Sequence, residues 1–314
     1  MRVPTTTYSA AFTNDLNTLR ARQAALQQQA TTGLRVTAAS DDPAAMQSAL
    51  NFVADKTAAQ QYNANVTALQ DRSNQIYSVL TALQTISSKA GEYATSAGNG
   101  ALQNANKPSL VSGLNTLIES ALKEANTRDS ATGAGLFGGT SGVTAPFVAT
   151  RDSSGNVTSV SYAANEAVND TAIGKGAAIS VDVPGANTSG SGARGLFTDS
   201  RSGADFFANL IKLRDDIAAG NSAAVAGADT AAVQKDSDNL IYHIGNVGAT
   251  QTRLNLTATT LQNQLSALDK NISDATNADL VQTMVQLNQA QNSYQAALQS
   301  GAKIMQLSIL NYIQ

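Results

Sequence analysis

Both ends of the chain carry apolar side chains at alternating steps of three and four residues. Near the N-terminus this heptad pattern begins at Phe12 and stops at Gly33. Its positions are Phe12, Leu16, Leu19, Gln23, Leu26 and Ala30. A matching pattern near the C-terminus consists of Leu280, Met284, Leu287, Gln291, Tyr294, Leu298 and Met305. Heptad spacing is typical of helices that pack lengthwise on another helix, so it predicts a long helix at each end.

Two further long helices are predicted between these ends. The run Ser40-Asp41-Asp42-Pro43 offers capping oxygens, carboxylates that suit a positive helix end, and a proline tolerated in a first turn, so it predicts a helix start. The apolar pattern then continues almost unbroken to Gly98. The most regular pattern covers residues 240–272, and Ser273-Asp274 marks the start of the last helix. Shorter helices are predicted over residues 108–126 and 203–217.

A segment of different character lies between residues 133 and 195. It is rich in Gly, Ser and Thr and shows no helical period. Residues 178–183 alternate strictly between apolar and polar side chains, and the strand-like residues 157–162 follow a turn signal that predicts a hairpin with residues 147–150. We therefore predict a small β domain inserted between the helical parts.

These elements predict a mainly α fold, in which long antiparallel helices from both chain ends form a coiled-coil rod and a helical bundle with a small inserted β domain. Three domains are expected. They are a terminal coiled-coil assembly domain of residues 1–40 and 274–314, a helical bundle of residues 41–135 and 197–273, and a variable, β-rich outer domain of residues 136–196.

A scarcity of charge changes the interpretation of the terminal helices. Charged residues make up 14% of the chain, against about 25% in an average globular protein. From Ala275 to Gln314 the only charged side chains are Asp279 and Lys303. A half-solvated helix would carry more charge, so we expect one stripe to pack on the N-terminal helix and the rest to contact other subunits. A polar, uncharged surface, or a helix buried in a monomeric bundle, would also fit this composition.

The side chains expected at the assembly interface come from both terminal helices. They are Leu16, Leu19, Leu26, Leu280, Met284, Leu287, Tyr294, Leu298, Met305 and Leu310. A second apolar side of the last helix is formed by Val281, Val285, Ile304, Leu307, Ile309 and Leu310. Apolar groups in more than one direction indicate more than one packing partner.

Charge and targeting signals exclude several classes of partner. The net charge is −3 and the Lys and Arg residues are scattered, which argues against nucleic acid. The absence of Cys removes disulfides, thiolate metal sites and cysteine nucleophiles. The N-terminal sequence lacks the apolar region of a cleavable signal peptide, and no apolar run is long enough for a membrane-spanning helix. We expect neither nucleic-acid binding nor membrane insertion.

Possible catalytic groups are few. His243 is the only histidine and lies within a heptad segment, where a flank or core role is far commoner than catalysis. Gly174-Lys175-Gly176 lacks the spacing of a phosphate loop, and no Gly-x-Ser-x-Gly elbow is present. The pairs Asp41-Asp42 and Asp215-Asp216 are adjacent in sequence, which suits helix ends and exposed faces. We therefore expect a non-enzymatic protein with no catalytic, cofactor-binding or metal-binding residue and no cofactor.

Two short motifs resemble the N-terminal signature of the flagellin superfamily. The run Thr32-Gly33-Leu34-Arg35-Val36 is followed by Ser40-Asp41-Asp42-Pro43-Ala44-Ala45. Gly33 would end one helix, Arg35 with Asp41 and Asp42 would polarise a short connector, and Pro43 would open the next helix. An ordinary capped loop explains the connector locally, but the matching flanks favour the family.

Three features are more similar to the hook-associated protein 3 family of hook-filament junction proteins than to filament flagellins. They are the opening Met1-Arg2-Val3, the run Leu136-Phe137-Gly138-Gly139-Thr140 with Pro146-Phe147, and the end Leu307-Ser308-Ile309-Leu310-Asn311-Tyr312-Ile313. The end departs from the family pattern by Ile for Leu and an extra Gln314.

This resemblance implies a structural subunit that forms the junction between hook and filament of the bacterial flagellum. The implied partners are further copies of the chain in a ring or tube, hook-associated protein 1, flagellin, the flagellar export apparatus and an export chaperone. The implied location is extracellular, in the flagellum, after export without a cleavable signal peptide. A minor flagellin that forms the filament itself is the alternative, and an adhesin that uses the β domain is a third.

Overall fold

A computed structural model describes the backbone of residues 5–98 and 106–313 and the side chains of residues 10–98 and 106–303. The chain divides into two compact units, one of residues 1–59 and 263–314 and the other of residues 60–262. No helix within the described ranges is long and apolar enough to cross a membrane.

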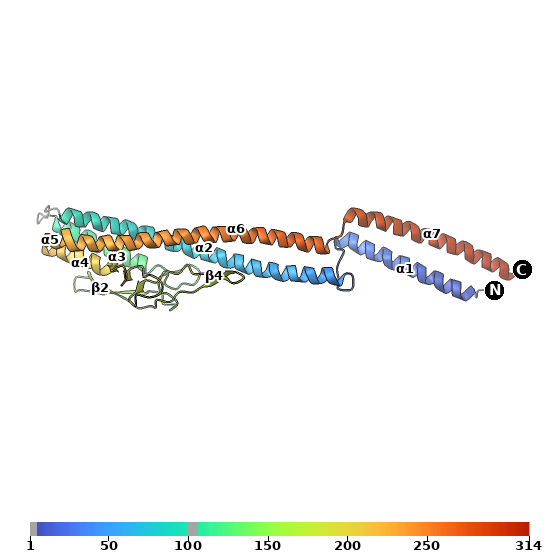
Figure 1. Ribbon diagram of the computed structural model, residues 1–314, viewed down its shortest axis with the longest axis horizontal. Helices are drawn as coiled ribbons and strands as arrows, with labels where there is room; N and C mark the ends of the chain where they lie inside the picture. The colour runs from blue at the N-terminus through green and yellow to red at the C-terminus, as the bar shows by residue number, and fades with distance from the viewer. Residues whose placement is uncertain (1–4, 99–105, 314) are drawn as a thin grey trace. The chain divides into compact units, whose positions relative to one another are not determined.

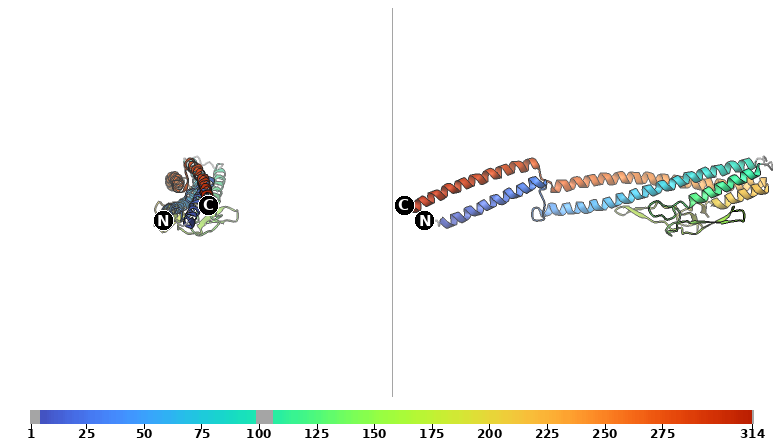
Figure 2. Two further views of the ribbon diagram at one scale, coloured as in Figure 1. Left: turned by 90° about the vertical axis from the view of Figure 1, so that its right-hand side faces the viewer. Right: turned by 180° about the vertical axis from the view of Figure 1, so that it is seen from behind.

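The first unit contains the two chain ends. Helix α1 (Thr5–Thr32) packs antiparallel on α7 (Leu280–Ile313), as both views in Figures 1 and 2 show. The unit also holds the start of α2 (Pro43–Gly98) and the end of α6 (Thr230–Thr276), which are joined by an ion pair of 2.5 Å between Lys56 and Asp269. The predicted terminal helices therefore exist and pack on each other.

In the second unit α2 and α6 pair antiparallel and are joined by uncharged side chains. Hydrogen bonds run from Gln70 to Asn255 at 2.7 Å, from Gln251 to Asn74 at 3.1 Å and from Gln84 to Ser237 at 3.3 Å. Such contacts explain how long helices with so few charges hold a register. The shorter helices of this unit are α3 (Lys107–Ala125), α4 (Phe206–Ala219), α5 (Ser222–Ala224) and a π-helical turn, η1 (Val225–Asp229), before α6.

The β region of this unit consists of short strands beside the helices (Figure 2). Strands β1 (Phe147–Arg151) and β2 (Val157–Tyr162) form the expected antiparallel hairpin. Its turn is closed by Asp152, whose carboxylate accepts the amides of Ser154 and Asn156 at 2.8 and 2.9 Å. The remaining strands are β3 (Thr171–Gly174) with β4 (Ala177–Ile179), and β5 (Ala186–Asn187), β6 (Thr198–Asp199) and β7 (Ala204–Asp205) in a three-stranded sheet.

One predicted strand is shorter than its sequence pattern. The alternation over residues 178–183 predicts one strand, but β4 ends at Ile179. Val181 and Val183 are still buried, at 6% and 8% exposure. The alternating pattern thus located the buried face correctly, although no neighbouring strand continues the ladder beyond Ile179 in the described structure.

Helices and β region share a single core. Phe147 and Phe197 of the β region lie with their ring centroids 4.7 Å apart, and Phe197 stacks on Phe207 of α4 at 5.2 Å. The surrounding helical residues include Ile76, Leu80, Leu83, Leu114, Ile118, Leu210 and Leu213. The mainly helical fold with long antiparallel helices and an inserted β region is confirmed.

The compact units do not follow the expected domain boundaries. They divide the chain between residues 59 and 60 and between 262 and 263, whereas the sequence suggests 40 and 274. Both observed boundaries fall inside α2 and α6, where a continuous helix gives no change in composition to mark them. The β region, expected as a separate domain, lies within the second unit. The three-part division stays a prediction.

Candidate assembly site

The most buried residues of α7 in the helix pair are small, whereas several of its large apolar side chains are exposed. Its inward face includes Thr283 and Ala290, which are 5% and 6% exposed, and the buried Gly301. The large apolar side chains on other faces are exposed, namely Leu280, Val281, Met284, Val285 and Leu298. Val281 reaches 77% exposure. Large apolar side chains on these faces of α7 are therefore exposed while smaller ones are buried.

The face of α1 that contacts α7 carries large side chains. Leu26 is buried, and Phe12, Leu16 and Leu19 are half-buried. The ring of Phe12 lies directly over Gly301, so that a Cβ added there would overlap it. Large groups on α1 and small ones on α7 let the two helices approach closely. With this packing, the exposed apolar side chains of α7 listed above remain uncovered in the described structure.

The ten predicted interface residues therefore fall into separate groups. Leu16, Leu19 and Leu26 of α1 lie with Leu287 and Tyr294 of α7 at least half-buried in the helix pair. Leu280, Met284 and Leu298 are 49%, 53% and 44% exposed. Met305 and Leu310 lie outside the residues whose side chains the structure describes. The heptad spacing alone does not determine which stripe of α7 faces α1, because Leu, Thr and Ala can all occupy a packed heptad position.

The connector between α1 and α2 is tied to the turn between α6 and α7. Gly33 adopts a φ of 72°, which a residue with a Cβ resists, and its carbonyl accepts the amide of Ala278 at 2.8 Å. Leu34 forms an isolated antiparallel bridge with Asn277. The Arg35 guanidinium donates to the carbonyl of Ala275 at 3.0 Å. These bonds fix the end of α1 at the start of α7, and so set the register of the helix pair.

The two carboxylates of the connector have different local roles. Asp41 accepts the amides of Thr37 and Ala38, both at 3.0 Å, and these bonds hold its pKa below the ordinary value. Asp42 accepts the amide of Ala45 at 3.0 Å in the first turn of α2, and this bond, followed by Arg35 at 3.0 Å, lowers its pKa. The first carboxylate closes the connector loop and the second caps a helix. The bond from Arg35 to Ala275 had no signal in the sequence.

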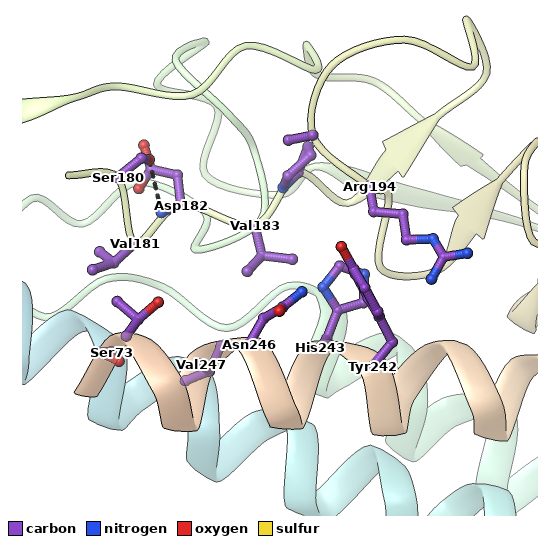
Figure 3. A pocket seen from close by; sticks show the side chains of 13 residues that line it. Ser73, Ser180, Val181, Asp182, Val183, Arg194, Tyr242, His243, Asn246 and Val247 are labelled. Atoms are coloured by element: carbon purple, nitrogen blue, oxygen red, sulfur yellow. Dashed lines mark hydrogen bonds between the residues drawn. The ribbon is translucent and has the colours of Figure 1, made fainter. Parts of the chain in front are cut away.

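His243 lies at a pocket in the second unit, between residues 180–184 and α6. The pocket encloses about 200 Å³, and Figure 3 shows Val181 and Val183 pointing into it from one side and Asn246 and Val247 from the other. The histidine is 4% exposed and its Nε2 donates to the carbonyl of Gly195 at 3.1 Å. Burial lowers its pKa to about 4, so the ring is neutral at physiological pH. This geometry matches the expected core histidine.

Arg194 lies above the ring of Tyr242 in the same pocket, with its guanidinium carbon 4.2 Å from the ring centroid. In the described part of the chain, no three or more His, Cys, Asp or Glu side chains gather where they could hold a metal ion. The polar groups found here connect segments of the chain to one another.

Comparison with known proteins adds an independent line of support. Residues 3–141 match the model of the bacterial flagellin N-terminal helical region. The N-terminal part of the chain is therefore similar to that region of bacterial flagellins. The match includes α1, the connector and α2, and it supports the expected structural, non-enzymatic role. No curated protein sequence matches the chain.

Solved structures share the fold at low sequence identity. A structure from Vibrio parahaemolyticus assigned as a flagellar hook-associated protein has a TM-score of 0.63 at 21% identity and covers 76% of this chain and 100% of its own. FlgL of Xanthomonas campestris has a TM-score of 0.56 at 16% identity, covering 69% and 98%. Flagellar hook-associated protein-3 of Legionella pneumophila has a TM-score of 0.50 at 12% identity, covering 76% and 98%. At these identities the likeness shows a common fold.

Proposed function

We propose that the chain is a structural subunit of the bacterial flagellum that forms the junction between hook and filament. The observation that carries the proposal is the outward apolar surface of α7, in a chain whose N-terminal region is similar to that of bacterial flagellins. Exposed apolar surface of this kind marks protein contacts in soluble proteins. The fold shared with hook-associated proteins supports the junction, as do the sequence motifs at both chain ends.

The proposed partners follow from that position. Copies of the chain would contact one another in a ring or tube, with hook-associated protein 1 on one side and flagellin on the other. Delivery would use the flagellar export apparatus, with an export chaperone, and end outside the cell in the flagellum. The outward surface of α7 and the expected interface residues on both terminal helices are the proposed contact sites.

A minor flagellin that builds the filament is the second candidate, because the matched N-terminal region is itself named for flagellin. Microscopy of a tagged copy separates the two: a focus at the hook-filament boundary supports the junction, whereas label along the filament contradicts it. Purified protein that extends alone into long filaments would also reject the junction.

The contact surface can be tested on α7 itself. Met284→Asp places a charge among the exposed apolar groups, and we expect the purified protein to keep its helical content and melting temperature while losing assembly and motility. Gln289→Asp is the matched control, because Gln289 is an exposed polar position of the same helix and should tolerate the charge. Normal incorporation of the Met284→Asp protein, measured by fractionation of flagella, would reject this surface as a contact.

A further inference from the structure

Three polar side chains form a buried stripe along α6. Asp236, Asn239 and His243 follow one another at steps of three and four, so they lie on one face of the helix. Their exposed fractions are 2%, 1% and 4%. Polar groups so deeply buried are costly unless hydrogen-bonded, so their partners indicate their role.

All three side chains bind the segment in which the chain returns from the β region to the helices. Asn239 donates to the carbonyls of Gly195 and Leu196 at 2.9 and 2.8 Å, and His243 donates to the same Gly195 carbonyl at 3.1 Å. A side chain at Gly195 would overlap the neighbouring backbone of Thr198, so this contact requires glycine.

The other end of the segment is held by Asp236. Its carboxyl accepts the amide of Asp205 at 2.9 Å and the side-chain amide of Asn209 at 3.1 and 2.9 Å. The stripe thus binds both ends of residues 195–205, where β6, β7 and the start of α4 meet α6. Among the described residues, neither Asp236 nor Asp205 has a cationic ion-pair partner.

We propose that this stripe is a clamp that fixes the return of the β region to α6, and that the clamp holds almost equally well from mildly acidic to neutral pH because a buried carboxyl group lies at one end of it and a buried imidazole at the other.

The groups facing the two titratable members determine the sense of each response. Burial raises the pKa of Asp236 to about 7, and the carboxylate of Asp205 adds to the rise. Burial also raises the pKa of Asp205, so Asp205 acts in the same sense. From the α2 side, the adjacent contact comes from the uncharged Gln84. On α4, Lys212 is paired with Asp216 and Asp229, and on α6, Lys235 and Asp238 are exposed.

His243 has charged neighbours of both signs. Burial is the main cause of its lowered pKa, with Arg194 and Arg201 acting in the same direction and Asp199 against them. Asp199 itself has its pKa lowered to about 2 by Arg201 and by backbone amides, against the opposing effect of burial. Asp199 therefore stays ionised throughout the range in which His243 and Asp236 titrate.

The two responses have opposite signs when the clamp opens to solvent. When the clamp opens, the pKa of Asp236 returns toward its ordinary value of 3.8, so rising pH between about 4 and 7 favours opening. The pKa of His243 returns toward its ordinary value of 6.5, so falling pH between about 6.5 and 4 favours opening. One proton changes an opening equilibrium about tenfold per pH unit, and the two effects cancel over their common range.

Hydrogen exchange of the amides of Leu196, Phe197 and Phe206, corrected for intrinsic rates, measures this opening between pH 4.5 and 6.5. We expect the wild-type opening constant to change less than about threefold. In Asp236→Asn the constant should fall with rising pH by up to about a hundredfold, and in His243→Gln it should rise by a similar factor. The double variant should have a smaller slope than either single variant, because only Asp205 then still titrates. The control Asp238→Asn, at an exposed position of the same helix, should behave like the wild type.

Single variants without a slope, or with slopes of the same sign, would overturn the proposal. A measurement on the wild type covers the case in which a variant does not fold. His243 is the only histidine, so its ring signals in an NMR titration need no assignment by mutation. A midpoint near 4 supports the proposal, and a midpoint near 6.5 contradicts it.

Discussion

At the scale of single residues, Arg72 is the cation that two buried carboxylates share. Its guanidinium pairs with Asp129 and, at 2.8 Å, with Asp182, and it donates to the carbonyl of Leu136 at 3.4 Å. The carboxylates are only 5% and 11% exposed. One side chain of α2 therefore neutralises two buried charges from segments on either side of the β hairpins. Nothing in the spacing of the sequence connects these residues.

Replacing this arginine by an apolar residue should be strongly destabilising. In Arg72→Met both carboxylates would stay buried without a cation, which costs about 3–5 kcal/mol in comparable cases. Denaturant unfolding at pH 7 measures the loss. Adding Asp129→Asn and Asp182→Asn should restore part of it, whereas Lys89→Met, at an exposed ion pair of the same helix, should cost far less. Equal losses for the two Met variants would contradict this account.

The stability at Arg72 should also depend on pH. Burial alone would raise the pKa of Asp129, but the amides of Thr132 and Ala131 together with Arg72 hold it below the ordinary value of 3.8. A lowered pKa means that the folded state favours the carboxylate. Its contribution is complete above pH 3.8 and is lost as the pH falls through the lowered value.

At the scale of helices and strands, the sequence predicted which elements exist better than which face each one buries. The heptad patterns located α1, α2, α6 and α7 because a repeat sustained over many turns rarely arises by chance. They could not place Leu280 or Met284 outside the helix pair, since the choice depends on the volumes that α1 and α7 present to each other. Similarly, alternation located the buried side of residues 178–183 but not the end of β4, which depends on a pairing partner.

The contact between Phe12 and Gly301 tests this volume argument for the helix pair. In Gly301→Leu the new side chain would overlap the ring, and we expect a loss of about 1–3 kcal/mol in the stability of the pair. Adding Phe12→Ala should recover part of the loss, because it removes the obstructing ring. Ser300→Leu, at the adjacent exposed position, is the control and should leave hydrogen exchange in α1 and α7 unchanged. If Gly301→Leu and Ser300→Leu behave alike, close approach at residue 301 does not hold the pair.

At the scale of the whole molecule, the two compact units differ in their charge content and in how they bury apolar side chains. The first unit combines a charge-poor helix pair with exposed apolar groups, a combination that suits contacts with other chains. The second unit is built around a core that takes side chains from α2, α3, α4 and α6 and from the β region alike. Sequence composition separated the β region from the helices because it reports local backbone preference. It could not report the shared core, which arises from contacts distant in sequence.

The shared core changes how the β region can be tested for an adhesive role. Deleting residues 140–195 would remove Phe147, Val157 and Val183 from beneath the helices, so we expect the variant to lose cooperative unfolding and to bind a hydrophobic dye. Lost adhesion in such a variant would report a collapsed core rather than a missing ligand site. Val148→Ser, at a 51% exposed strand position, changes the surface alone and should leave the melting curve unchanged. A deletion variant that still unfolds in one sharp transition, with no dye binding, would show that the helices form their core without the β region.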